Sequence, residues 1–380
     1  MARLPQLLQR PRAVLSTARS VVRFTFDEAE SGPFASLPRK PKREVFTALV
    51  RWWRRHGSVG PDAIRFGVDR VGGPDPDDLV PYAVFKDVRD RTNRRLGGSD
   101  DFNYVCLLDD KFVFAQFVGS LGYPVPRNLA FLSSDGVEPL APRRPRRPLD
   151  ALWTGEWTWD GFCKPLAGRQ GQGVFPLSVS GDGVRAGGEP VSADGLRSML
   201  HGRSILQERV RQHPALAALH PSSLNTLRIV TVASDDGVRP LVVALRVGAG
   251  GQHVDNFAWG GFVMDTDLER GTVSGRALRK KGGSPVGRHP DTGVAFDGYP
   301  VPFLAESVEV VSQLHGDLYG FHTVGWDVAI TPDGPSIIEG NDRWDGDVAL
   351  VDSGVMPRYL AAVGEPAPYR HRWAQGLGSL

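Results

Sequence analysis

The sequence predicts an α+β protein in which a mostly helical first region precedes a strand-rich remainder. Three observations support this fold class. Apolar residues recur at helical spacing over much of the first 121 residues, runs rich in β-branched residues follow, and a chain of 380 residues is long enough for two or three lobes. A hydrophobic content of 41% and a charged content of 23% are typical of a globular protein with a real core.

Composition argues against several classes of function. The 45 Lys and Arg residues against 43 Asp and Glu leave a net charge of +2, which disfavours a nucleic-acid binder. Cys106 and Cys163 lie far apart without a CxxC motif, so we expect neither a disulfide framework nor a zinc site, and a reducing, cytoplasmic setting. We find neither an apolar run of membrane-spanning length nor a signal-peptide pattern.

The first 26 residues predict a basic amphipathic helix. They contain five arginines and no acid before Asp27, with apolar residues at helical spacing. Such a helix can lie on an anionic membrane surface. We favour the alternative, a helix packed on its own protein with its arginines in solvent, because the apolar stripe lacks Trp or Phe before Phe24.

Further helices are expected along the first region and beyond it. Residues 44–56 predict one helix, residues 62–96 two more, and residues 108–121 an amphipathic helix. No G-x-G-x-x-G motif follows a strand there, so a dinucleotide-binding unit is not expected.

A glycine-rich loop follows a short strand that carries Lys164. The loop contains Gly168, Gly171 and Gly173, and a second strand follows it. Glycines let backbone N–H groups converge on an anion, and a lysine at the strand end adds a point charge. The lysine precedes the glycines, unlike in a Walker A motif, so phosphate binding and a plain hairpin turn both remain open.

Two later strands each carry an arginine within an apolar run. Residues 225–232 include Arg228 and residues 241–247 include Arg246. An arginine in such a strand is unfavourable unless an anion meets it. A phosphate site and an ion pair with Asp or Glu explain this pattern about equally well. Beyond these strands, the Gly- and Lys-rich residues 270–290 predict a mobile loop.

A β-hairpin near the C-terminus is the most informative stretch. Two apolar-rich runs, 324–331 and 335–341, flank Pro332-Asp333-Gly334, which suits a three-residue loop. With that loop, Asp327 lies opposite Glu339, and Asn341 shares their face of the ladder. Two carboxylates directly across a ladder repel each other unless a cation lies between them. Oxygen ligands favour Mg²⁺ or Mn²⁺. The alternative is an ordinary hairpin whose acids face water.

Taken in order, these pieces resemble the ATP-grasp superfamily, and within it the sugar-transfer-associated branch related to glutamate ligases. The resemblance covers residues 109–341. The matching segments are DDKFVFAQFVGSLGYPVP, FCKPLAGRQGQGV, ILQERVRQHP, LNTLRIVT, VDNFAWGG and GWDVAITPDGPSIIEGN. It implies an ATP-grasp fold whose two α+β lobes clasp ATP, after a mostly helical N-terminal region. We therefore expect a helical region at 1–108, a central lobe at 109–210 and a C-terminal lobe with the magnesium site at 211–380.

The resemblance also implies roles for individual residues. Two lysines contact the nucleotide phosphates, the glycine loop covers the triphosphate, and the strand near residue 207 holds the adenine. The implied ATP-binding residues are Lys111, Lys164, Gly168, Gln170, Gly171, Gly173, Gln207, Glu208 and Val210. The implied residues at the reacting phosphates are Arg228, Arg246 and Asn256. The implied magnesium ligands are Asp327, Glu339 and Asn341, in agreement with the hairpin argument.

The implied function is an ATP- and magnesium-dependent ligase that joins a small-molecule carboxylate to an amine through an acyl phosphate. The branch suggests a role in polysaccharide or natural-product tailoring. One departure is that the first 108 residues do not resemble the α/β N-terminal lobe of better-known ligases, so the resemblance does not identify the substrates. Two alternatives are a phosphotransferase of the same fold and a non-catalytic nucleotide-binding module at the membrane surface.

Overall fold

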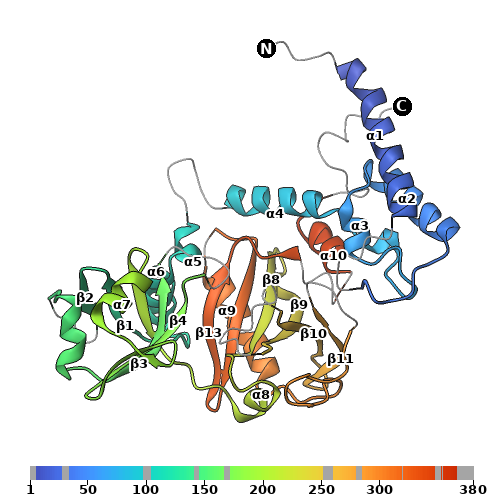
Figure 1. The fold of residues 1–380 in the computed structure, drawn as a ribbon. Helices are drawn as coiled ribbons and strands as arrows, with labels where there is room; N and C mark the ends of the chain where they lie inside the picture. Colours follow the sequence, from blue (N-terminus) through green and yellow to red (C-terminus); the bar gives the residue numbers. More distant parts are fainter. Residues whose placement is uncertain are drawn as a thin grey trace.

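The computed structural model describes residues 6–27, 34–96, 104–140, 145–166, 172–250, 260–279, 285–318, 320–346, 352 and 354–365. These residues form a helical region and two antiparallel sheets, which lie side by side in the order shown in Figure 1. The predicted α+β class is confirmed.

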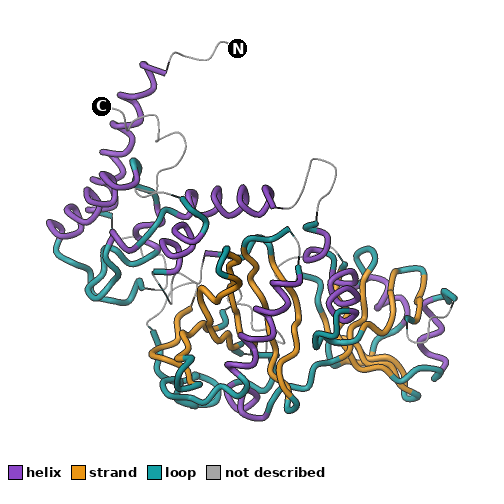
Figure 2. The backbone as a smooth tube through the Cα atoms, turned by 180° about the vertical axis from the view of Figure 1, so that it is seen from behind, coloured by secondary structure: helices purple, strands orange, loops and turns teal. Residues whose placement is uncertain are grey.

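The helical region contains the helices that the first part of the sequence predicts. Proline and glycine set their limits: Pro41 precedes α2, and Gly57 ends it with a φ of 75°. The elements are α1 (Gln6–Phe26), α2 (Lys42–His56), α3 (Pro61–Arg65), the 3-10 helix η1 (Pro76–Asp78) and α4 (Tyr82–Leu96). In the ribbon view and in the tube view α1 extends away from the two sheets (Figures 1 and 2).

Helix α1 packs on its own protein by one face, as predicted. Thr17, Val21 and Thr25 are buried, and Val21 belongs to the core that α2 and α4 share. Arg39 donates a hydrogen bond to the carbonyl of Phe24 and so supports the last turn of the helix. On the opposite face, the described side chains from Leu15 onward are exposed.

The first sheet, coloured green in Figure 1, has the strand order β2-β1-β7-β3-β4-β5-β6. One face packs on the 3-10 helix η2 (Leu149–Thr154) and on α7 (Ala193–Met199) around a single core. Its strands are β1 (Asn128–Ser133), β2 (Gly136–Pro139), β3 (Trp159–Pro165), β4 (Phe175–Ser180), β5 (Gly183–Ala186), β6 (Glu189–Pro190) and β7 (Ser204–Glu208).

The second sheet has the strand order β11-β10-β9-β8-β12-β13 and carries a core on each face. One core includes residues of α9 (Leu304–Asp317), α8 (Pro214–Leu219), α5 (Cys106–Asp109) and α6 (Lys111–Ser120). The other core is shared with the helical region and with α10 (Val355–Ala362). The strands are β8 (Thr226–Ser234), β9 (Gly237–Val247), β10 (Phe262–Asp267), β11 (Thr272–Arg279), β12 (Thr323–Thr331) and β13 (Gly334–Asn341).

The loop predicted over residues 270–290 is wrong for its first part. Residues 272–279 form β11, which pairs with β10 at the edge of the second sheet. Val273 and Ala277 are buried, but Gly275, with a φ of 73°, interrupts the strand where the pairing is irregular. That glycine and the neighbouring arginines hide the strand pattern in the sequence.

Candidate functional site

The β12–β13 hairpin pairs Asp327 with Glu339, as the sequence predicts. The predicted loop is wrong, however. Thr331 pairs with Gly334, so the turn holds two residues rather than three. The ladder shifts between Asp327 and Val328, where Ile338 of β13 forms a bulge. The extra residue in β13 offsets the shorter turn, and the register at Asp327 is therefore the predicted one.

Asp327, Glu339 and Asn341 lie together on one face of the second sheet. Asp327 is 7% exposed, and the amide of Asn341 donates to Glu339 Oε1 at 3.3 Å. Burial alone would raise the pKa of Glu339, but the charge of Lys111 and hydrogen bonding with Asp327 outweigh it, so that pKa lies below its usual value. The three predicted metal ligands are thus close neighbours.

Two arginines on adjacent strands meet the carboxylate of Asp327. Arg228 of β8 is paired with Asp327 across the ladder, and its Nε lies 3.1 Å from Oδ1. Arg246 of β9 lies 3.2 Å from Oδ1 and 3.3 Å from Oδ2 through its Nη1. The ion pair that the sequence left open as one alternative is therefore present. Arg228 Nη1 is buried and has no hydrogen-bond partner among the described residues.

Lys111 and Lys164 reach this cluster from outside the second sheet. Lys164 of β3 donates to Gln207 Oε1 at 2.7 Å. Lys111 begins α6, whose N-terminus is capped by Asp110. Burial lowers the pKa of Lys164 to about 8, Glu339 acts in the opposite direction, and Lys111 adds to the lowering. Both lysines are therefore near enough to Glu339 to act on its charge and on each other.

The described side chains of the site carry an excess of positive charge. Four cations surround two carboxylates, which leaves a local charge of about +2 when all are ionised. The cations are Lys111, Lys164, Arg228 and Arg246, and the carboxylates are Asp327 and Glu339. Such a cluster favours a polyanionic ligand over a neutral one.

The sequence matches the model of a known family over residues 97–365, which is more than half of the chain. That family is described as sugar-transfer associated ATP-grasp. The chain belongs to this family. The resemblance drawn from the sequence motifs is confirmed, and with it the ATP-grasp fold.

Several solved structures resemble this ATP-grasp protein at low sequence identity. N5-carboxyaminoimidazole ribonucleotide synthetase from Thermotoga maritima is 12% identical, with a TM-score of 0.37 over 69% of this chain and 50% of that one. L-amino acid ligase from Bacillus licheniformis is 11% identical, with a TM-score of 0.36 over 68% and 48%. D-alanyl-alanine synthetase A from Vibrio cholerae is 12% identical, with a TM-score of 0.35 over 71% and 62%. The match thus spans about half of the first two proteins. No curated protein matches the sequence.

The acidic pair of this ATP-grasp protein fits a divalent cation. Asp327 and Glu339 lie directly opposite each other in the ladder, where two ionised carboxylates repel unless a cation lies between them. The amide oxygen of Asn341 completes a hard-oxygen donor set of the kind Mg²⁺ takes. Among the described residues, no group of three or more His, Cys, Asp and Glu side chains is placed to hold a metal ion. The predicted set consists of two carboxylates and one amide.

The residues assigned to adenine lie at the end of β7. Gln207 is 3% exposed and turns toward Lys164, and its own amide donates to Pro126 O and Asn128 Oδ1 at 3.3 Å each. Glu208 is exposed and pairs with Arg127 at 3.2 Å, and Val210 is partly buried just beyond the strand. Gln207 thus orients Lys164, and its predicted contact with adenine stays a prediction.

Part of the predicted phosphate loop lies outside the described residues, namely Gly168, Gln170 and Gly171, and so does Asn256. Gly173 is described. It has a φ of 69°, and a Cβ there would lie 3.0 Å from Pro165 Cγ, so glycine suits the position on both counts.

Sequence reasoning missed Asn93 of α4, which binds the backbone at both ends of the hairpin. Its amide donates to Thr323 O at 3.1 Å and to Asp342 O at 2.8 Å, and its carbonyl oxygen accepts from the N–H groups of His322 and Thr323. The signal was available, because Asn93 lies one helical turn after Arg89 and about two turns after Phe85, and both of these residues are buried. A polar residue on a core-facing stripe calls for a buried partner.

Proposed function

We propose that this protein is an ATP- and magnesium-dependent ligase that joins a small-molecule carboxylate to an amine. The observation that carries the proposal is the cluster in which two adjacent carboxylates, Asp327 and Glu339, are ringed by four cations. A charged cluster of this composition suits a triphosphate bound with a divalent cation. Family membership supports the same ligand.

The proposed reaction has two steps. A carboxylate oxygen of the first substrate forms a bond to the γ-phosphorus, the bridging P–O bond breaks, and ADP leaves with an acyl phosphate formed. The amine nitrogen then attacks the acyl carbon, phosphate leaves, and the amine proton passes to solvent. Magnesium, when bound, supplies charge neutralisation at the phosphate oxygens.

The side chains have distinct tasks in this proposal. Asp327, Glu339 and Asn341 would hold the metal, while Lys111 and Lys164 hold the phosphates in line. Arg228 and Arg246 neutralise the charge that develops as the phosphoryl group moves. The reaction needs no covalent enzyme intermediate, so positioning and electrostatics are the contribution of the protein.

Product analysis tests the proposal. The full chain is incubated with ATP, Mg²⁺, pooled amino acids and acidic sugars, and ADP, phosphate and acceptor products are followed by chromatography. ADP and free phosphate that appear only with both co-substrates support the ligase. ADP with a phosphorylated acceptor would instead identify a phosphotransferase, and the absence of turnover with every pool would leave a nucleotide-binding module.

Glu339→Gln provides the matched variant, because it removes one charge without changing the side-chain shape. We expect its turnover to fall by at least about a hundredfold, the scale seen when a group that stabilises the transition-state charge is lost. Glu306→Gln, an exposed carboxylate at the start of α9, is the control and should turn over as the parent does. Equal activity of Glu339→Gln and parent at saturating Mg²⁺ would remove Glu339 from the site.

A further inference from the structure

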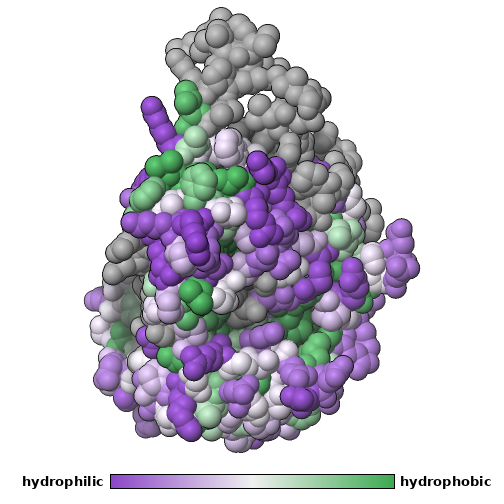
Figure 3. All heavy atoms as spheres, turned by 90° about the vertical axis from the view of Figure 1, so that its right-hand side faces the viewer, coloured by the Kyte–Doolittle hydropathy of each residue, from purple (hydrophilic) through white to green (hydrophobic). Residues whose placement is uncertain are grey.

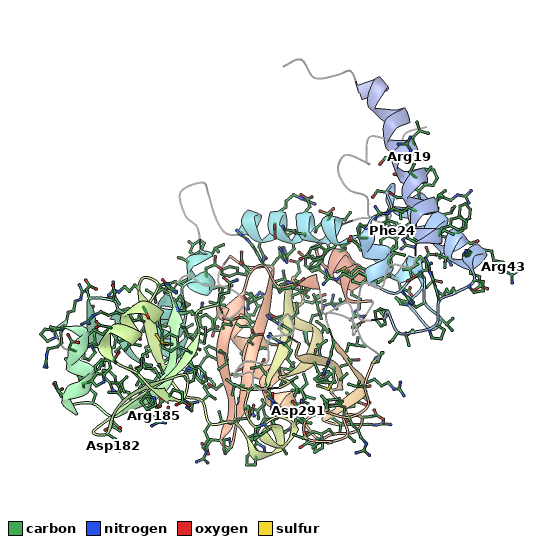
Figure 4. All side chains as sticks on the ribbon, viewed as in Figure 1. Arg19, Phe24, Arg43, Asp182, Arg185 and Asp291 are labelled. Atoms are coloured by element: carbon green, nitrogen blue, oxygen red, sulfur yellow. The ribbon has the colours of Figure 1, made fainter. Side chains whose placement is uncertain are left out.

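The outward face of α1 continues onto α2 as an exposed surface that combines apolar and basic residues. We call it the α1 surface. It comprises Leu15, Arg19, Val22, Arg23 and Phe26 of α1 with Lys42 and Phe46 of α2. Figure 4 shows Arg19 on α1 and Arg43 on α2 at the outside of the helical region.

The apolar members of the α1 surface are far more exposed than is usual for their type. Leu15 is 59% exposed, Val22 52%, Phe26 60% and Phe46 46%. On α1 they recur at intervals of seven and four residues, so they form one stripe, opposite the buried Thr17, Val21 and Thr25. In the part of the helix whose side chains are described, one face is buried and the apolar stripe on the other face is exposed. Exposed apolar stripes of this kind mark interaction sites.

Basic residues interleave with the stripe. Among the described residues, Arg19, Arg23 and Lys42 of this surface and the neighbouring Arg43 outnumber the acids Asp27 and Glu44 by two. Arg23 pairs with Asp27 at 3.0 Å, but both side chains remain more than half exposed. Such a pair holds together weakly in water and does not cancel the attraction of the patch for a negative surface.

Contacts between the two helices make the surface continuous. Lys42 Nζ lies 5.1 Å from the centre of the Phe26 ring, which links the end of α1 to the first turn of α2. Phe46 is one helical turn further along α2 and is exposed on the same side as Lys42. Figure 3, which views the right-hand side of Figure 1, shows hydrophobic residues beside hydrophilic ones in its upper part.

We propose that the α1 surface binds the surface of a lipid bilayer that contains anionic phospholipid. An interfacial helix places its apolar stripe at the boundary between headgroups and acyl chains and keeps its arginines among the phosphates. The α1 surface offers both elements in that arrangement. No helix among the described residues is long and apolar enough to cross a membrane, so the proposed contact is with the bilayer surface. The proposal does not depend on the reaction that the protein catalyses.

Vesicle co-sedimentation tests the proposal with the full chain. Vesicles of phosphatidylcholine alone are compared with vesicles that contain about one part phosphatidylglycerol in three, at low and high salt. We expect binding to the mixed vesicles, weakened by salt, and little binding to phosphatidylcholine alone. Arg19→Glu with Arg23→Glu should weaken binding by at least about fivefold for each of the two arginines that is lost.

Val22→Glu with Phe26→Glu should weaken binding to the same vesicles by at least tenfold, because it replaces two of the three apolar residues of the stripe on α1 with carboxylates. Leu268→Glu is the matched control: Leu268 is 43% exposed, lies in the turn between β10 and β11, and should leave binding unchanged. Thermal unfolding shows that each variant is folded. The proposal is overturned if the mixed vesicles do not retain the parent, if the Val22 and Phe26 variant binds equally well, or if light scattering shows that the stripe instead joins two copies of the chain.

Discussion

The two faces of the second sheet are built from the same strands but carry opposite chemistry. Leu227, Ile229 and Trp326 point to one face, where they join the core under α9. Arg228 and Asp327 alternate with them and point to the other face. One face packs in the core under α9, and the other carries the charged cluster beside the core that it shares with the helical region. Strand alternation therefore places the candidate site on the face of the sheet opposite the core under α9.

The charged face depends on its neighbours in a way that the apolar face does not. Trp344 packs so close to Gly325 that a Cβ there would lie 2.4 Å from the Cβ of Trp344. Gly325 lies opposite Asn341 in the ladder. The helical region contacts this end of the sheet through Asn93 and through Arg89, which donates to Trp344 O. The helical region thus packs against the end of the sheet that carries Asn341.

The largest effect on stability is expected from Asp327→Asn. The substitution keeps the shape of the side chain but leaves Arg228 and Arg246 without their common carboxylate, in a place where all three are less than a fifth exposed. Removing one member of such a buried group costs about 3–5 kcal/mol. Urea denaturation measures the loss, and a change below about 1 kcal/mol would mean that the arginines find other partners.

Ile229→Ala tests the apolar face of the same strand. Ile229 is fully buried next to Arg228, and the loss of its side chain should lower the free energy of unfolding by about 3 kcal/mol. The charged face stays intact, so the folded variant should bind ATP as the parent does. Calorimetry at a temperature where both are folded checks this, and a parallel loss of ATP affinity would show that the two faces are not independent.

Local patterns in the sequence predict much of this arrangement. Alternation and turn residues are sufficient for the hairpin, and they place Asp327 opposite Glu339 although the turn and the bulge were not foreseen. The pairing of Arg228 and Arg246 with Asp327 was only one of two alternatives, because strand order is a long-range property. The contact of Asn93 with residues about 230 and 249 positions later in the chain has no local signal for its partner.

Asn93→Leu separates the contribution of the helical region from that of the sheet. The substitution leaves two carbonyl groups and two N–H groups of the hairpin ends without their partner, at a buried position. We expect a loss of about 2 kcal/mol in the free energy of unfolding. Lys86→Ala, on the exposed side of α4, is the control and should change it little. A loss no larger than that of the control would show that water replaces the amide.

The smallest effect concerns the pH dependence of Lys164, which connects the first sheet to the charged face. Its pKa, lowered to about 8 mainly by burial, means that the ammonium loses its proton as the pH rises through about 8. A cation favours a bound polyanion, so the affinity for ATP should fall between pH 8 and 9, by up to about tenfold. The free protein should gain stability over the same range, because Lys164 of the unfolded chain keeps its proton up to a pKa near 10.5.

Lys164→Arg keeps its charge throughout and should give a flat affinity profile by calorimetry. If the affinity of the parent for ATP were equally independent of pH, the charge of Lys164 would have no part in nucleotide binding.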